Sequence, residues 1–137
     1  LRKESSINIK ITVSRHVIID CKINSINGKF ILDTGASNSC VNYLYADKFK
    51  LDFKKSNEKA ASATEAINET FCSKSNILEI GNFKKNDFEI ILFDMSYINN
   101  SFREKEIEEV DGIIGGDILS EFDANINYEK KLLTLKL

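Results

Sequence analysis

The segment KFILDTGAS, residues 29–37, places the strongest constraint on the fold of this chain. Its apolar run 30–32 has no polar side chain, which is typical of a strand buried on both faces, and it leads directly into Asp33. A carboxylate is costly to bury unless it is hydrogen-bonded or its pKa rises. Gly35 lets the backbone turn closely, Thr34 can anchor the loop, and Ser37 can bond the carboxylate from the side. Although an isolated Asp-x-Gly is more often a simple turn, this context predicts a supported acid at a strand end.

A second constraint is the segment GIIGGDIL, residues 112–119, about 80 residues further along the chain. Its first three residues predict a short buried strand that runs into Gly115 and Gly116. Asp117 follows these glycines, and an Asp side chain often accepts hydrogen bonds from the free amides at the start of a helix. We therefore expect Asp117 to cap a helix that extends through Phe122.

Strand patterns account for most of the remaining sequence. Apolar residues alternate with polar ones over residues 7–13, which is the spacing of a half-buried strand. Asn27-Gly28 favours a tight type I′ turn, so residues 17–33 predict a β-hairpin. Further strands are expected at 77–80, 83–93, 126–128 and 133–137, and helical or irregular segments at 42–49 and 96–109. The chain is therefore expected to be mostly β, with a closed or sandwiched architecture and one or two short helices.

Residues 31–37, Ile-Leu-Asp-Thr-Gly-Ala-Ser, resemble the active-site loop of retropepsin-like aspartic proteases. Residues 112–119 are similar to the second half of the same signature, in which an apolar-apolar-Gly segment crosses behind the loop and leads into a helix. The resemblance extends over about residues 7–137 and looks closest to the single-domain bacterial members of the family. It implies a closed, mostly β retropepsin-like (acid protease) barrel, formed as a single domain by residues 1–137, with 95–109 as a helical or loop insertion.

The resemblance implies a role for each residue of the two segments. Asp33 would be catalytic, Thr34, Gly35, Ala36 and Ser37 would support the active-site loop, and Ile113, Ile114 and Gly115 would lie behind it. In this chemistry two carboxylates share a proton and hold a water molecule between them; one acts as base on the water, and the other donates to the scissile carbonyl oxygen. The implied reaction is hydrolysis of a peptide or protein substrate in an extended conformation, without a metal or other cofactor.

The second carboxylate is not supplied by a second loop of this chain, which has one Asp-Thr-Gly. Asp111 is followed by glycine without the intervening hydroxyl residue, and Asp117 is expected to cap a helix rather than to act in catalysis. A two-fold dimer presents the same loop twice, so we expect a homodimer with Asp33 of each subunit at the axis. The resemblance implies that Thr34 bonds across this axis. The alternating strands at both ends of the chain are candidate interface edges, since unpaired edges invite pairing.

The resemblance also implies a β-hairpin flap that closes over the substrate, at about residues 58–69. Flaps of this family typically carry glycine at the tip, whereas this segment has none. Alanine and serine are nevertheless small enough to let a peptide backbone approach. A surface helix over residues 58–66 is the alternative, since the segment is polar and rich in alanine. The substrate-binding tip would be formed by Ala60, Ala61, Ser62, Ala63 and Thr64.

Composition argues against several other classes of protein. The net charge of −2 gives no electrostatic footprint for a nucleic acid, and no apolar run approaches the roughly 20 residues needed to span a membrane. The start lacks both Met and the apolar core of a signal peptide, which is typical of a fragment or processed product of a soluble protein, cytoplasmic or periplasmic. Cys21, Cys40 and Cys72 are odd in number and form no CxxC, which predicts buried thiols rather than a disulfide framework or a zinc site.

Two alternative functions compete with the protease. A Ser-His or Cys-His enzyme would need His16, the sole histidine, which lies in a strand-like stretch without a nucleophile motif nearby. A surface or packed histidine is therefore favoured, as is a solvated helical face for residues 103–109. The same fold could also serve as a non-catalytic or latent module for dimerisation or peptide binding, although the intact Asp33-Thr34-Gly35 favours an enzyme.

Overall fold

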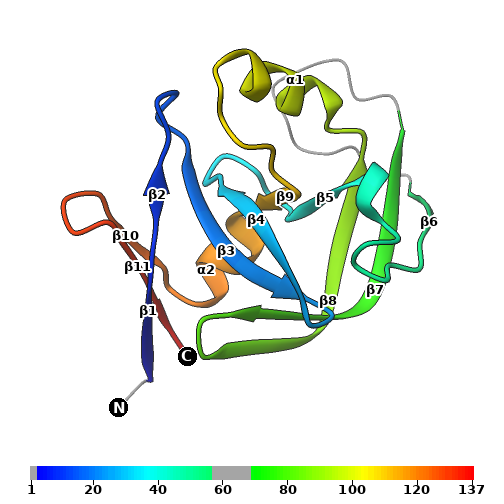
Figure 1. Ribbon diagram of the computed structural model, residues 1–137. Helices are drawn as coiled ribbons and strands as arrows, with labels where there is room; N and C mark the ends of the chain where they lie inside the picture. Colours follow the sequence, from blue (N-terminus) through cyan, green and yellow to red (C-terminus); the bar gives the residue numbers. More distant parts are fainter. Residues whose placement is uncertain (1–2, 57–68) are drawn as a thin grey trace.

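The computed structural model describes residues 3–56 and 69–137, and strands dominate it (Figure 1). The strands are β1 (Glu4–Asn8), β2 (Lys10–Ile11), β3 (Val17–Ile23), β4 (Ile26–Leu32), β5 (Cys40–Asn42), β6 (Lys54–Ser56), β7 (Thr70–Ile80), β8 (Phe83–Phe93), β9 (Gly112–Ile114), β10 (Asn125–Asn127) and β11 (Leu132–Lys136). The helices of the described residues are the α-helices α1 (Ser96–Glu104) and α2 (Gly116–Glu121) and one 3-10 turn, η1 (Tyr43–Tyr45).

Six strands close into a barrel. Their order is β3-β4-β9-β5-β8-β7, and β7 pairs back onto β3. The closing contact is short, with Lys22 opposite Glu79 and Ile23 opposite Leu78. The short strands β2 and β6 extend the sheet beyond this ring. The prediction of a mostly β, closed barrel with two short helices is thus confirmed for the part of the chain that the structure describes.

Alternation along the strands divides the buried residues into two clusters. Side chains such as Ile19, Phe30, Leu92 and Ile114 point into the barrel and form the main core together with the helix α2. Their sequence neighbours point outward, because successive side chains of a strand lie on opposite faces. A second apolar cluster therefore lies on the outer face of the barrel, beneath α1.

The first hairpin has its turn in a different place from the one predicted. The turn lies at Asn24 and Ser25, where φ is 51° and 70°, as a type I′ turn requires. Asn27 and Gly28, the predicted turn, lie inside β4. Gly28 is needed there for space, since a Cβ would lie 2.7 Å from the ring of the buried Phe30. The Asn-Gly pair thus reflects packing rather than chain reversal.

The helix expected over residues 42–49 is reduced to the single 3-10 turn η1. Asn42 ends β5, and its side-chain oxygen accepts hydrogen bonds from Leu44 N and from Met95 N, at 3.2 Å each. This side chain therefore holds η1 next to the start of α1.

Two other predicted elements are present. The helix expected within residues 96–109 is α1, and the strand expected at 77–80 is the last part of the longer β7.

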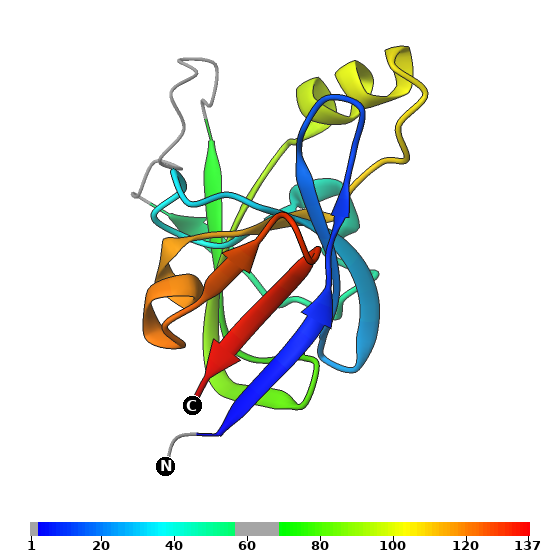
Figure 2. The ribbon, with the colours of Figure 1, turned by 90° about the vertical axis from the view of Figure 1, so that its left-hand side faces the viewer.

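The strands at the two ends of the chain pair with each other. Figure 2 shows β1, β11 and β10 side by side, with the start of β1 and the end of β11 at the same end of the small sheet. β11 is the central strand, and its Leu133 and Leu135 are fully buried in the main core. β11 therefore offers no free edge for pairing with a second copy, contrary to the expectation. The free edges of this sheet are the outer edges of β1 and β10.

Substitution of Gly28 tests its packing role. Gly28→Ala would push a methyl group against two buried rings, since a Cβ would lie 2.7 Å from Phe30 and 2.8 Å from Phe49. Overpacking of this kind costs about 1–3 kcal/mol in the free energy of unfolding, measured by urea denaturation. The control is the exposed neighbour Asn27→Ala, which should change it by less than about 0.5 kcal/mol. A larger loss of unfolding free energy for Asn27→Ala than for Gly28→Ala would contradict the packing role of Gly28 and favour a turn at Asn27-Gly28.

Candidate active site

The loop of residues 33–39 leaves β4, passes across the end of β9 and returns as β5. β9 lies between these two strands, parallel to β4 and antiparallel to β5. Ile113 is opposite Ile31 of β4 and Cys40 of β5, so the short strand fills the gap that the loop spans. The segment Ile113, Ile114 and Gly115 therefore lies behind the loop.

Asp33 lies at the point where β4 ends and the loop begins. Its backbone N donates to Ile114 O at 3.0 Å, which continues the ladder between β4 and β9 by one residue. Its carbonyl accepts from Ala36 N at 3.1 Å, and its Oδ1 accepts from Gly35 N at 2.9 Å. The half-buried carboxylate is thus anchored through one oxygen, and Oδ2 makes no hydrogen bond within the described residues.

The neighbours of Asp33 face in different directions. Thr34, Gly35 and Ser37 are exposed, whereas Ala36 is buried in the cluster beneath α1. The expected bond from the Ser37 side chain to the carboxylate is not formed; the Gly35 amide holds it instead. The first part of the loop therefore exposes Thr34 and Ser37 and packs Ala36 inward.

Two glycines allow the backbones to cross closely. A Cβ at Gly115 would lie 2.6 Å from Ala36 O, and one at Gly112 would lie 2.1 Å from Cys40 O. The adjacent Gly116 N donates to Ala36 O at 2.7 Å. A side chain at Gly115 would therefore displace the loop, and one at Gly112 would push β5 off β9, because backbone atoms cannot yield as a flexible side chain does.

Asp117 joins the end of the loop to the start of α2. Its Oδ1 accepts from Ser39 Oγ at 2.8 Å and from Ile118 N at 2.9 Å, and its Oδ2 accepts from Ser39 N at 3.0 Å. Ser39 Oγ in turn accepts from Gly115 N at 3.0 Å. Asp117 accepts from a free amide at the start of α2, as predicted, but Gly115 is the N-cap and Asp117 lies in the first turn. Sequence analysis missed Ser39, which belongs to no motif.

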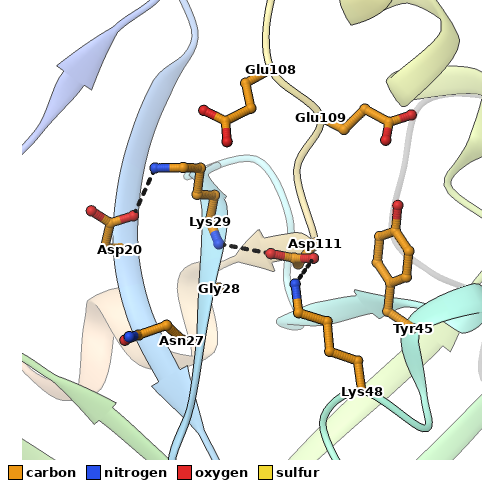
Figure 3. A pocket seen from close by; sticks show the side chains of 9 residues that line it. All are labelled: Asp20, Asn27, Gly28, Lys29, Tyr45, Lys48, Glu108, Glu109 and Asp111. Carbon is orange, nitrogen blue, oxygen red and sulfur yellow. Dashed lines mark hydrogen bonds and ion pairs between the residues drawn. The ribbon is translucent and has the colours of Figure 1, made fainter.

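Asp111 fixes the other end of β9. Its N donates to Lys29 O and its carbonyl accepts from Asn42 N, both at 2.8 Å. Its carboxylate accepts from Lys29 N at 2.9 Å and from Lys48 Nζ at 2.8 Å (Figure 3). A single residue thus bonds both strands that flank β9 and adds an ion pair. Asp111 is a second structural anchor of the site without a local signal in the sequence.

The cavity in Figure 3, of about 660 Å³, lies beside this clamp. Asp33 is not among its lining residues. Its two lysines are already paired, Lys29 with Asp20 and Lys48 with Asp111. The cavity is therefore a mixed-charge surface hollow near the middle of β4 rather than a cleft at the candidate carboxylate.

All three cysteines are buried thiols, as predicted. Burial raises the pKa of Cys40 to about 12, and the negative charges of Asp117 and Asp33 add to the effect. Burial also raises the pKa of Cys21, with smaller contributions from Asp20 and Asp111. Cys21 and Cys40 are therefore protonated at neutral pH and poor nucleophiles.

His16 is a packed histidine. Its Nδ1 lies 2.7 Å from Ser14 Oγ, and its ring contacts the ring of Phe102 at a centroid distance of 5.1 Å. Within the described residues no carboxylate bonds its other ring nitrogen, so the arrangement lacks the third group of a catalytic triad.

The family model described as aspartyl protease matches residues 19–118. The chain belongs to the aspartyl protease family. The matched range includes the Asp33 loop, β9 and the start of α2. No curated protein matches the sequence.

Solved structures show the same retropepsin-like fold. A retropepsin-like aspartic protease from Rickettsia conorii has a TM-score of 0.69 at 20% identity, over 99% of this chain and 93% of the other. The EIAV protease in complex with the inhibitor HBY-793 has 0.60 at 18%, over 86% and 98%. The retroviral protease-like domain of Ddi1 from Leishmania major has 0.58 at 17%, over 88% and 87%.

The flap was expected to close over the site. Its tip, formed by Ala60, Ala61, Ser62, Ala63 and Thr64, lies outside the described residues. Within residues 3–56 and 69–137, no helix has the length and apolar character needed to cross a membrane.

The contact between Ser39 and Asp117 is testable with two serines of the same loop. Ser39→Ala would leave the buried Gly115 amide without its acceptor and remove a donor to Asp117. We expect a loss of about 1–3 kcal/mol in the free energy of unfolding, because an unsatisfied buried group bears its full desolvation cost. Ser37→Ala, at an exposed position, should change it by less than about 0.5 kcal/mol. Equal losses would contradict the anchoring role of Ser39.

Burial of the thiols predicts their reactivity. At mildly alkaline pH the native protein should be alkylated by iodoacetamide at none of Cys21, Cys40 and Cys72, because all three are buried and the pKa of Cys40 is raised to about 12. In denaturant all three should react, as counted by mass spectrometry. Rapid labelling of Cys40 in the native protein would show that the loop beside it opens.

Proposed function

We propose that this protein is an aspartic endopeptidase in which Asp33 of two copies forms the catalytic pair. The observation that carries the proposal is the state of the Asp33 carboxylate. It lies half-buried at the end of a barrel strand, with one oxygen held by Gly35 N and the other without a partner in the described residues. An acid with an open oxygen can hold a water molecule, and membership of the aspartyl protease family supports this use.

The proposed reaction is general acid–base hydrolysis. Two carboxylates close to each other cannot easily both ionise, so the pair retains one proton at the operating pH. The ionised carboxylate takes a proton from the bound water, and the protonated one donates to the carbonyl oxygen of the scissile bond. The loop residues Thr34 to Ser37 would hold Asp33 in position during these transfers.

The second carboxylate is proposed to come from a second copy, because the chain has one Asp-Thr-Gly. A two-fold axis at the loop brings the same residue to the centre twice. The exposure of Thr34, Gly35 and Ser37 supports this arrangement, since these residues are open to contact with a partner. Thr34 is proposed to bond across the axis.

The proposed substrate is an extended stretch of peptide. Main-chain hydrogen bonds along such a segment provide affinity, and pockets for alternate side chains provide specificity. Residues 58–69 are proposed as the flap over this peptide, with Ala60, Ala61, Ser62, Ala63 and Thr64 at its tip.

Removal of the Asp33 charge tests the catalytic assignment. Asp33→Asn should lower the cleavage rate of an unstructured protein by at least about 100-fold between acidic and neutral pH, since general acid–base groups contribute about 10²–10⁴-fold. The matched control is Asp52→Asn, at an exposed position away from the loop. Equal rates for wild type and Asp33→Asn would refute the assignment. No cleavage by either, from protein that sediments as a dimer, would favour the non-catalytic or latent peptide-binding module.

A mixing experiment tests the shared active site. If each site needs Asp33 from both subunits, an excess of Asp33→Asn should suppress wild-type cleavage as mixed dimers form. After subunit exchange, the fractional loss of the cleavage rate should approach the fraction of wild-type chains that are paired with a variant chain. Unchanged wild-type activity in the mixture, with exchange shown by mass spectrometry, would mean that one chain suffices.

A further inference from the structure

The outer face of the barrel carries an uninterrupted belt of apolar side chains, one from each of its six strands. The partners follow one another around the barrel: Ile18 opposite Ile31, Ile31 opposite Ile113, Ile113 opposite Cys40, Cys40 opposite Ile91, and Ile91 opposite Cys72. All six belong to the second apolar cluster, and each is at most 9% exposed. The outer face of a barrel is ordinarily polar when it meets water, so this belt needs a cover.

The belt passes directly beside Asp33. Ile31 precedes Asp33 by two residues, and Leu32 between them points into the main core. Alternation thus places Ile31 and Asp33 on the same side of the strand, roughly 7 Å apart along it. Ala36, whose amide bonds Asp33 O, belongs to the same cluster. The apolar belt is therefore within side-chain reach of a peptide bond held at Asp33.

The helix α1 provides the cover. Met95 and Phe102 are buried in the belt cluster, and Ile98 packs against it. In Figure 1, α1 lies at the same end of the molecule as the loop that follows β4. Two buried hydrogen bonds fix it there, from Asn99 Nδ2 to Val110 O at 3.0 Å and from Val110 N to Asn99 Oδ1 at 2.9 Å. α1 is thus held in a fixed position over the belt.

We infer that Phe102 determines specificity by filling the apolar space beside Asp33, so that a substrate side chain flanking the scissile bond on the α1 side must be small. The inference rests on the proposed function. Phe102 is the largest side chain that α1 contributes to the cluster, and its ring also contacts His16. Because Ile31 and Ile113, the belt residues nearest Asp33, are at most 8% exposed, a bulky substrate side chain finds little apolar surface to occupy there.

Truncation of Phe102 should leave a hollow that a substrate side chain can occupy. Removing a buried ring leaves an apolar hollow, and such hollows bind apolar groups of matching size. With peptides that differ only at the residues flanking the scissile bond, Phe102→Ala should raise kcat/KM for a Phe substrate relative to an Ala substrate. We expect a shift on the order of 10- to 100-fold, the range over which apolar pockets discriminate side chains by size.

The control is Phe122→Ala, which truncates a buried phenylalanine of the main core. This variant should lose stability to a similar degree and leave the ratio of Phe to Ala substrates unchanged. If Phe102→Ala does not fold, the smaller truncations Phe102→Leu and Ile98→Ala serve in its place, with smaller shifts in the same direction. An unchanged ratio in these folded variants would overturn the inference.

Binding measurements separate the inference from the proposed function. Peptides with a reduced, non-cleavable bond, carrying Ala or Phe at the flanking position, are titrated by calorimetry into Asp33→Asn with and without Phe102→Ala. If wild type cleaves but Phe102→Ala changes neither the kcat/KM ratio nor the affinity ratio of Phe to Ala peptides, the inference fails and the proposed function stands. If wild type does not cleave but the binding ratio shifts toward Phe, the proposed function fails and the assignment of Phe102 stands. An equal gain for all peptides would make α1 a general cover and overturn the inference.

Discussion

The close crossing of the loop 33–39 over the end of β9 is the constraint on which the rest of the site depends. Gly116 N donates to Ala36 O at 2.7 Å, and a Cβ on Gly115 would lie 2.6 Å from the same oxygen. Two stretches remote in sequence are thus held at backbone distance, which only glycine permits at this position. Asp33 takes its position from this crossing, since β9 lies directly behind it. The barrel strands, in turn, serve to hold the two stretches in register.

Three carboxylates lie around β9, and their surroundings give them different capacities. Asp111 accepts from Lys29 N and Lys48 Nζ, and Asp117 accepts from Ser39 and a helix amide. Both are engaged through both oxygens, which fixes the side chain. Asp33 is held through one oxygen and half-buried. The two saturated carboxylates act as clamps, whereas Asp33 keeps an oxygen without a hydrogen-bond partner in the described residues.

Local patterns in the sequence predicted a mostly β chain and a supported acid at Asp33, because alternation and Asp-Thr-Gly are properties of short segments. The closed barrel and the strand behind the loop were implied by the family resemblance. The features that were missed depend on contacts between distant residues. Ser39 bonds a partner 78 residues away, and Asp111 bonds one 82 residues away, and no local spacing encodes either contact. The turn was misplaced for the same reason, since Gly28 fits a turn as well as it fits beneath Phe30. The apolar belt is likewise invisible without the register of six strands.

The pairing of β1 with β11 has a consequence for how the protein forms. Ser6 and Thr134 share a hydrogen bond although 128 residues separate them, so this sheet joins two strands with nearly the whole described chain between them. Such non-local pairings have a large loop-closure entropy and slow folding. Leu133 and Leu135 complete the main core only when this sheet forms. A nascent chain on the ribosome would therefore lack a finished core until β11 emerges, so the earlier strands wait for a late segment before the core can close.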